Sequence, residues 1–145
     1  TQTGLIDKII RAAGLLDCNP SDMPMAQIPI GRDVDGERYK DDWHYASIVG
    51  MLQCLQQHTR PDITYAVNQC ARFSSDPKES HAKAVKRIVR HLKGTREKGL
   101  IFNLTGEVAL DCYCDADFCG NWAVEDPTHP SSVKSRNGYV FTMSG

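Results

Sequence analysis

The chain has 145 residues, of which 41% are hydrophobic, so it is about one domain long and long enough to bury a core. The formal net charge of −1 gives no information about a charged partner. The distribution of charge along the chain is more informative. No apolar run approaches the ~20 residues that span a bilayer, and the first residues do not resemble a signal peptide. We therefore expect a soluble protein that is neither secreted nor bound to a membrane.

The cysteines are too irregularly spaced for a structural zinc site, because no pair has the C-x-x-C spacing. Without a secretory signal, free thiols in a reducing compartment are the better interpretation. The six residues concerned are Cys18, Cys54, Cys70, Cys112, Cys114 and Cys119.

The first half of the chain has helical periodicity. Apolar residues recur at helical spacing over 3–16, and Asp17, Asn19 and Pro20 are expected to close this helix. Three prolines and two glycines then predict an irregular loop over 19–40, long enough to drape over a surface or to contact a partner. A second helix is predicted over 43–55.

Two further helices are predicted before the pattern changes. The third helix spans 63–73, with Pro61 in its first turn and Asp62 at the positive end of its dipole. The fourth runs to Lys93, with Asp76 as N-cap, Pro77 as its first residue and Glu79 as the returning carboxylate of a capping box. Gly94 is expected to end it in the left-handed conformation.

After Gly99 the period changes to two, which predicts strands. A short strand is predicted over 100–102, a strand with one buried face over 108–115, and a third over 139–143 after Asn137-Gly138. The segment 120–135 is expected to be a loop. Helices followed by strands indicate an α+β fold or two part-domains, with the boundary near 95–105.

Charge is segregated along the chain. Eight Lys or Arg residues and only two Glu lie between Pro77 and Gly99, whereas 106–126 holds six acidic residues and no Lys or Arg. A nuclease uses one surface to hold phosphates and another to hold cations near the scissile bond. The basic residues that recur along one side of the fourth helix are candidates for nucleic-acid contact, and an ordinary solvated helix face is the alternative: Lys83, Lys86, Arg87, Arg90 and Lys93.

Asp115 and Asp117 lie at the end of a predicted strand and point the same way, because side chains at i and i+2 share a face. Such a pair is able to ligate Mg²⁺, which prefers oxygen ligands, although two-metal hydrolysis needs further carboxylates from other elements. Two surface aspartates at a strand end are the alternative.

No other residue type suggests catalysis. The histidines have no metal-ligand spacing, so surface or capping roles are expected for His44, His58, His81 and His91. Neither a G-x-S-x-G context nor a glycine-rich phosphate loop occurs.

Several segments together resemble the Pol polyproteins of copia-type retrotransposons. The resemblance covers nearly the whole chain, in order and with compatible spacing. The segments that carry it are Leu16-Asp-Cys-Asn-Pro20, Tyr45-Ala-Ser-Ile-Val-Gly-Met-Leu52, Thr59-Arg-Pro-Asp-Ile-Thr-Tyr-Ala-Val-Asn68, Ala84-Val-Lys-Arg-Ile-Val-Arg-His-Leu-Lys-Gly-Thr95, Cys114-Asp-Ala-Asp-Phe-Cys-Gly120 and Ser135-Arg-Asn-Gly-Tyr-Val-Phe-Thr142.

The resemblance implies that residues 1–98 are the C-terminal, thumb-like or connection-like end of a reverse transcriptase. Residues 99–145 would then be the first strands of an RNase H domain. Asp115 would be the first catalytic, metal-binding carboxylate of RNase H, with Asp117 in the same motif and Mg²⁺ as the cofactor of the complete parent enzyme. The basic helix would track an RNA–DNA hybrid or template–primer duplex.

Two functions follow. In the first, the chain is a segment of a polyprotein whose parent performs RNA-directed DNA synthesis and RNase H cleavage. Tyr39-Lys-Asp-Asp42 has the Y-x-D-D spacing, but Asp41-Asp42 lies in a predicted loop. Only one other carboxylate cluster suggests a metal site, so we expect the chain to be inactive alone. Its partners would be nucleic acid and the rest of the polyprotein, in the cytoplasm or nucleus. In the second, it is a stand-alone nucleic-acid-binding or interaction module, retained for its basic helix.

Overall fold

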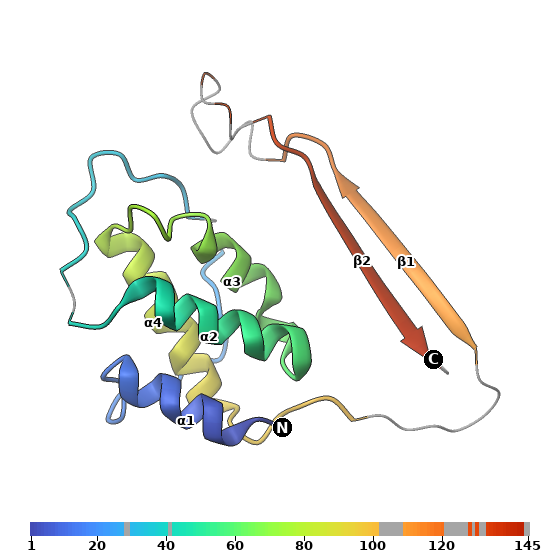
Figure 1. The fold of residues 1–145 in the computed structure, drawn as a ribbon, viewed down its shortest axis with the longest axis horizontal. Helices are drawn as coiled ribbons and strands as arrows, with labels where there is room; N and C mark the ends of the chain where they lie inside the picture. Colours follow the sequence, from blue (N-terminus) through green and yellow to red (C-terminus); the bar gives the residue numbers. More distant parts are fainter. Residues whose placement is uncertain are drawn as a thin grey trace. The chain divides into compact units, whose positions relative to one another are not determined.

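The computed structural model describes residues 1–27, 30–40, 42–101, 109–120, 128, 130 and 133–143. The chain divides into two compact units, Thr1–Leu100 and Ile101–Gly145. Within the described residues, the first unit holds four α-helices and a 3-10 helix, and the second holds a two-stranded antiparallel sheet (Figure 1). The α+β class predicted from the sequence is therefore confirmed, and the RNase H-like fold of the second part stays a prediction.

The helices of unit 1 form one bundle because each has an apolar face. They are α1 (Thr3–Ala12), α2 (Tyr45–His58), α3 (Thr64–Ala71) and α4 (Glu79–Gly94), with η1 (Pro61–Ile63) just before α3. Full burial of one large aliphatic side chain contributes about 1.5–3 kcal/mol, so the shared core stabilises the bundle. Its fully buried members include Ile6, Ile9, Ile48, Leu52, Leu55, Ile63, Ile88 and Leu92.

Helix α1 ends earlier than predicted. Gly14 has a φ of +65°, and the amides of Gly14 and Leu15 donate to the carbonyls of Arg11 and Ile10 at 3.1 and 3.0 Å. This is a Schellman motif, in which a left-handed glycine ends the helix. Leu16, predicted on the buried face, is therefore outside the helix and 58% exposed.

The long segment between α1 and α2 lies along α4. The amide of Ser21 donates to the carbonyl of Arg90 at 3.3 Å, and nearer the start of α4 the amide of Tyr39 donates to the carbonyl of Pro77, also at 3.3 Å. The loop predicted over 19–40 thus drapes over a surface of its own unit.

This pairing corrects the predicted start of the fourth helix. The backbone at Lys78 is extended and forms an isolated bridge with Arg38, so α4 begins at Glu79. Glu79 accepts from the amide of Lys40 at 2.9 Å. The returning side chain of the cap is instead His81, whose Nδ1 accepts from the amide of Lys78 at 3.0 Å. Asp76, predicted as N-cap, forms an ion pair with Lys78 at 3.3 Å.

The left-handed conformation predicted for Gly94 is not observed. Gly94 is instead the last residue of α4. A Cβ at this position would lie 2.8 Å from Cβ of Pro20. The absence of a side chain at Gly94 therefore allows the segment after α1 to approach α4.

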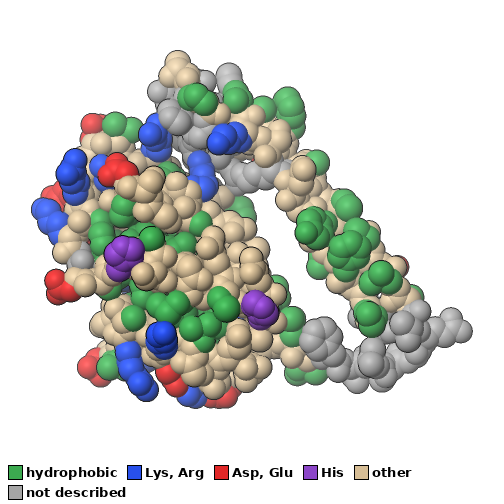
Figure 2. All heavy atoms as spheres, in the orientation of Figure 1, with side chains coloured by type: hydrophobic (Ala, Val, Ile, Leu, Met, Phe, Trp, Pro, Cys, Tyr) green, Lys and Arg blue, Asp and Glu red, His purple; other side chains and the backbone are tan. Residues whose placement is uncertain are grey.

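The described part of unit 2 is a hairpin of β1 (Leu110–Asp117) and β2 (Arg136–Met143), in which Cys112 pairs with Phe141 and Asp115 with Gly138. Leu110, Tyr139, Phe141 and Met143 share one face, and each is more than half exposed. Figure 2 shows hydrophobic side chains along this hairpin. The buried strand face predicted from the alternation is thus wrong for the described residues, because a sheet of two strands covers neither of its own faces.

Other predicted strand boundaries shift or fall outside the description. Leu100 and Ile101 are not in a strand, and Phe102 and Val108 lie outside the described residues. Asn137-Gly138, predicted to precede a strand, lies inside β2.

Candidate nucleic-acid interface

Helix α4 directs its predicted nucleic-acid-binding side chains away from the core. Its buried face consists of Ala82, Val85, Ile88, Val89 and Leu92, together with His81 and His91. Lys83 and Arg87 are exposed, whereas Lys86, Arg90 and Lys93 are half-buried. The helix therefore brings all five basic residues to its outer side, as the periodicity predicted.

Three of these five side chains bind the backbone of the segment after α1. Nε of Arg87 donates to the carbonyl of Met23 at 3.2 Å, and Nε of Arg90 donates to the carbonyl of Asn19 at 2.6 Å. Nζ of Lys93 donates to the carbonyls of Leu16 and Cys18 at 2.5 and 2.7 Å. These cations therefore hold the segment against α4, which is a structural role that the sequence did not indicate.

Lys83 differs from these three, because its ammonium group makes no hydrogen bond or ion pair with any described residue. Arg87 and Arg90 each donate only through Nε within the described residues, so their terminal nitrogens keep their donors. Phosphate oxygens accept from such groups. Lys83 is thus the clearest candidate for a phosphate contact.

A buried arginine joins η1 to the end of α4. Arg60 is 1% exposed, and its Nε and Nη2 donate to the two carboxylate oxygens of Asp62 at 2.9 and 2.7 Å. The same guanidinium donates to the carbonyl and the Oγ1 of Thr95 at 3.0 and 2.6 Å. The Arg60 guanidinium holds the pKa of Asp62 below its ordinary value, although partial burial of the carboxyl group opposes this.

The histidines have more varied positions than predicted. His44 caps α2 and His81 caps α4, but His81 is fully buried rather than on the surface. His91 is also buried, with its Nε2 3.2 Å from Oδ2 of Asp62 and its Nδ1 3.2 Å from the carbonyl of Ser21. His81 and His91 both occupy positions between apolar residues on the inward face of α4. This spacing is the sequence signal from which their burial could have been predicted.

The candidate metal ligands lie on the second unit. Asp115 and Asp117 occupy one face of β1, together with Asp111 and Tyr113. Asp115 is exposed, whereas the half-buried carboxylate of Asp117 lies against Gly120, where a Cβ would clash with it. The donors are the hard oxygens that Mg²⁺ prefers. Within the described residues, no group of three or more His, Cys, Asp or Glu side chains is arranged to hold a metal ion.

A comparison with known proteins assigns the family. The chain is 34% identical over 143 residues to the retrovirus-related Pol polyprotein from transposon RE1 of Arabidopsis thaliana, a match to 99% of this chain and 9% of that protein. The chain belongs to the retrotransposon Pol polyprotein family. A match of 40% identity over 101 residues, or 70% of this chain, joins it to the Pol polyprotein from transposon TNT 1-94 of Nicotiana tabacum.

Another relative is not named as a Pol polyprotein. The secreted RxLR effector protein 161 of Plasmopara viticola is 40% identical over 101 residues, which is 70% of this chain and 66% of that protein. This retrotransposon Pol segment thus spans between 7% and 66% of the length of these three relatives. No family model matches the chain, and no solved structure matches it either.

The Arg60 contacts join two of the segments on which the resemblance to the Pol family rests. The Thr59-Arg-Pro-Asp62 segment and the His91-Leu-Lys-Gly-Thr95 segment both carried the family resemblance. In the structure these two Pol segments meet through Arg60, Asp62, His91 and Thr95.

Among the described residues of this Pol segment, no helix is both long and apolar enough to cross a membrane.

Proposed function

We propose that the chain is the segment of a copia-type Pol polyprotein that joins the end of reverse transcriptase to the start of RNase H. The parent protein would perform RNA-directed DNA synthesis and cleave the RNA of RNA–DNA hybrids, in the cytoplasm or nucleus. The observation that carries the proposal is the match of 99% of the chain to one continuous part of a Pol polyprotein.

Within this segment, α4 contacts the phosphate backbone of a template–primer duplex or RNA–DNA hybrid. Lys83, Lys86 and the terminal nitrogens of Arg87 and Arg90 supply the positive charge on the outer side of the helix. Backbone contacts of this kind release counterions and do not depend on sequence, so affinity falls steeply as salt rises.

The nucleic-acid proposal is tested by fluorescence anisotropy with an RNA–DNA hybrid and a DNA duplex of unrelated sequence, between about 50 and 200 mM salt. Replacing both Lys83 and Lys86 with glutamine is expected to weaken binding to both duplexes equally and to lower the salt slope by about two. The control replaces Lys8 and Arg11 of α1, both exposed, with glutamine. Binding that ignores salt, or that both double variants weaken equally, contradicts the proposal.

Asp115 and Asp117 are the proposed Mg²⁺ ligands of the RNase H part. The ion would supply electrostatic stabilisation of the scissile phosphate when further carboxylates join it. We expect the chain alone to lack polymerase and RNase H activity, because two-metal chemistry needs carboxylates from several elements. Mg²⁺-dependent degradation of a hybrid by the purified chain, abolished by Asp115→Asn, is the result that would refute this expectation.

The second candidate is a stand-alone nucleic-acid-binding or interaction module. It is favoured by the relative from Plasmopara viticola, 66% of which is matched by this chain and which is not named as a polyprotein. The reading frame around the coding sequence separates the two candidates. An open frame that continues into polymerase and nuclease motifs supports the segment of a polyprotein, and start and stop codons close to the two ends support the module.

A further inference from the structure

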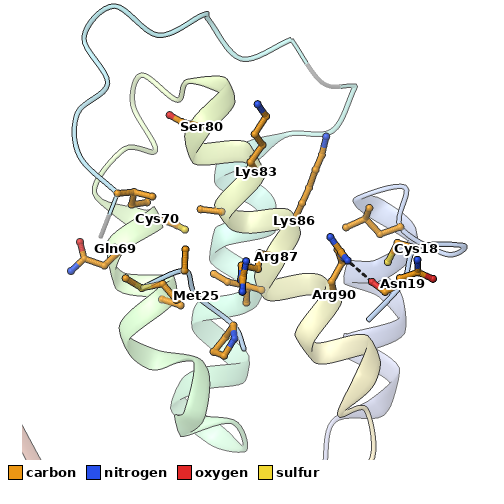
Figure 3. Close-up of a pocket in the computed structure, with 17 residues that line it drawn as sticks. Cys18, Asn19, Met25, Gln69, Cys70, Ser80, Lys83, Lys86, Arg87 and Arg90 are labelled. Carbon is orange, nitrogen blue, oxygen red and sulfur yellow. Dashed lines mark hydrogen bonds between the residues drawn. The ribbon is translucent and has the colours of Figure 1, made fainter. Parts of the chain in front are cut away.

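Unit 1 contains a cavity of about 670 Å³ between the segment after α1, helix α3 and helix α4. Ligand sites in proteins usually have about 300–1,000 Å³. Figure 3 shows Gln69 and Cys70 on α3 and Lys83, Lys86, Arg87 and Arg90 on α4. In the segment after α1, Met25 lies toward Gln69 and Cys70, and Cys18 and Asn19 lie toward Arg90. No prediction from the sequence pointed to this cavity, since the segment after α1 is far in sequence from the two helices that complete its walls.

Its interior is aliphatic. No aromatic side chain is among the described lining residues, which argues against a stacked nucleobase. The apolar groups come from all three walls: Leu15, Pro24, Met25, Ala26, Ile30, Ala66, Ala84 and Ile88.

The charged groups at the cavity are all of one sign. Lys83, Lys86, Arg87 and Arg90 line it, and no Asp or Glu is among the described lining residues. Figure 3 shows Lys83 and Lys86 leaving α4 toward the same side. Burial raises the pKa of Cys70 to about 12, so this thiol stays neutral and does not offset the positive charge. A cation or a metal ion is therefore disfavoured, and an anion is favoured.

The walls are held in place by hydrogen bonds. The Arg87 and Arg90 side chains bind the carbonyls of Met23 and Asn19, and the amide of Ser21 binds the carbonyl of Arg90. The segment after α1 thus has fixed positions on α4, so a ligand meets a cavity that is already formed.

We propose that this cavity binds an aliphatic carboxylate, with the hydrocarbon chain against the apolar interior and the carboxylate at the basic side chains. The inference does not depend on nucleic-acid binding, although a bound carboxylate and a phosphate would compete for Lys83. Both requirements, an aliphatic chain and a negative charge, are testable separately.

The first test compares acetate, hexanoate, octanoate and decanoate with decyltrimethylammonium, all below their micelle concentrations, on the full chain. The readout is the alkylation rate of individual cysteines by iodoacetamide, measured by mass spectrometry. Cys18 lines the cavity, whereas Cys54 of α2 is exposed and outside it, so Cys54 is the internal control.

We expect decanoate to slow the alkylation of Cys18 about tenfold at ten times its Kd and to leave Cys54 unchanged. Affinity is expected to rise about three- to fourfold for each added methylene, because each one leaves water for the cavity. If octanoate and decanoate protect Cys18 no better than acetate, or decyltrimethylammonium protects it equally well, the proposal is wrong.

Two variants locate the site. Lys83→Gln is expected to weaken decanoate about two- to fivefold, the effect of one partly exposed charge, whereas Lys8→Gln on α1 leaves affinity unchanged. Ala26→Trp fills the cavity from the exposed wall and is expected to abolish protection of Cys18 by decanoate, and Ala46→Trp on the exposed side of α2 is its control. Protection that survives Ala26→Trp overturns the assignment of the cavity.

Discussion

Arg60 is the residue on which the contact between η1 and the end of α4 depends. It is a fully charged side chain in the interior, and four hydrogen bonds to Asp62 and Thr95 offset the loss of its hydration. Five donors in a rigid plane allow arginine to satisfy both partners at once, and lysine cannot match this geometry.

Arg60→Lys is therefore expected to lower the free energy of unfolding by about 2–4 kcal/mol, since the charge stays buried and most of its bonds are lost. Urea unfolding followed by helical circular dichroism measures the change. Arg11→Lys, at an exposed site on α1, is expected to change stability by less than about 0.5 kcal/mol. Equal effects of the two substitutions would mean that the network is not required.

Asp62 makes the stability of unit 1 depend on acid. Its folded-state pKa is depressed, first by the hydrogen bonds from Arg60, so the carboxylate stabilises the fold above the unfolded-state pKa of about 4 and loses this effect as pH falls through the folded pKa. Asp62→Asn is expected to destabilise the chain at pH 7 and to have a smaller effect at pH 3, below the unfolded-state pKa. Urea midpoints at the two pH values give the comparison, and a constant difference would contradict it.

Residue-level roles were predictable only where the partner is near in sequence. The outward position of Lys83 and the capping by His44 follow from helical spacing and local geometry. The hydrogen bonds of Arg90 and Lys93 were not predictable, because their acceptors are main-chain carbonyls more than 70 residues away, and a carbonyl has no residue-specific signature.

At the scale of elements, Gly4 and Gly14 have opposite effects on the stability of α1 and the turn that ends it. Gly14 adopts a φ of +65° as it ends the helix, whereas Gly4 lies inside the first turn with nothing within 4 Å of the position of a Cβ. A side chain is disfavoured in the left-handed region, and alanine is preferred to glycine within a helix.

Gly14→Ala is expected to destabilise the chain by about 1 kcal/mol, and Gly4→Ala is expected to stabilise it by about 0.5 kcal/mol. The two chains differ by the same added methyl group, so a common effect of hydrophobicity cancels. Thermal or urea unfolding of the pair measures both signs. A stabilising Gly14→Ala would show that the Schellman geometry of α1 does not form in solution.

The existence of every α-helix in the described residues was predictable from periodicity, but the ends were not. Asp76, Pro77 and Glu79 form a strong local start signal, and the structure begins α4 at Glu79 because the backbone at Lys78 pairs with Arg38. Gly94 has the residue type of a helix stop, yet its lack of a side chain serves the close approach of Pro20. In both places a distant segment overrides the local preference.

At the scale of the whole molecule, the two units differ in how much surface they bury. Unit 1 has a continuous core to which α1, α2, α3 and α4 all contribute. The described part of unit 2 is a two-stranded hairpin, and its apolar residues Leu110, Tyr139, Phe141 and Met143 are exposed. A two-stranded hairpin alone is marginally stable in water, and its open edges favour association with other strands.

The difference in burial predicts a difference in local stability. Amide hydrogens open for exchange with a free energy that ranges from near zero in poorly packed segments to the global value in a core. In α4, residues 82–92 alternate between core and surface, with Val85, Val89 and Leu92 fully buried, so their amides should exchange only through unfolding of unit 1. The amides of 110–117 in the hairpin are not covered by such a core, so they should exchange orders of magnitude faster.

Hydrogen–deuterium exchange by mass spectrometry, at a concentration low enough to keep the chain monomeric, measures both segments in one sample. Arg60→Lys supplies the control, because it should speed exchange in 82–92 and leave 110–117 unchanged. Equal protection of the two segments, or a joint response to Arg60→Lys, would mean that helices and strands unfold as one cooperative unit.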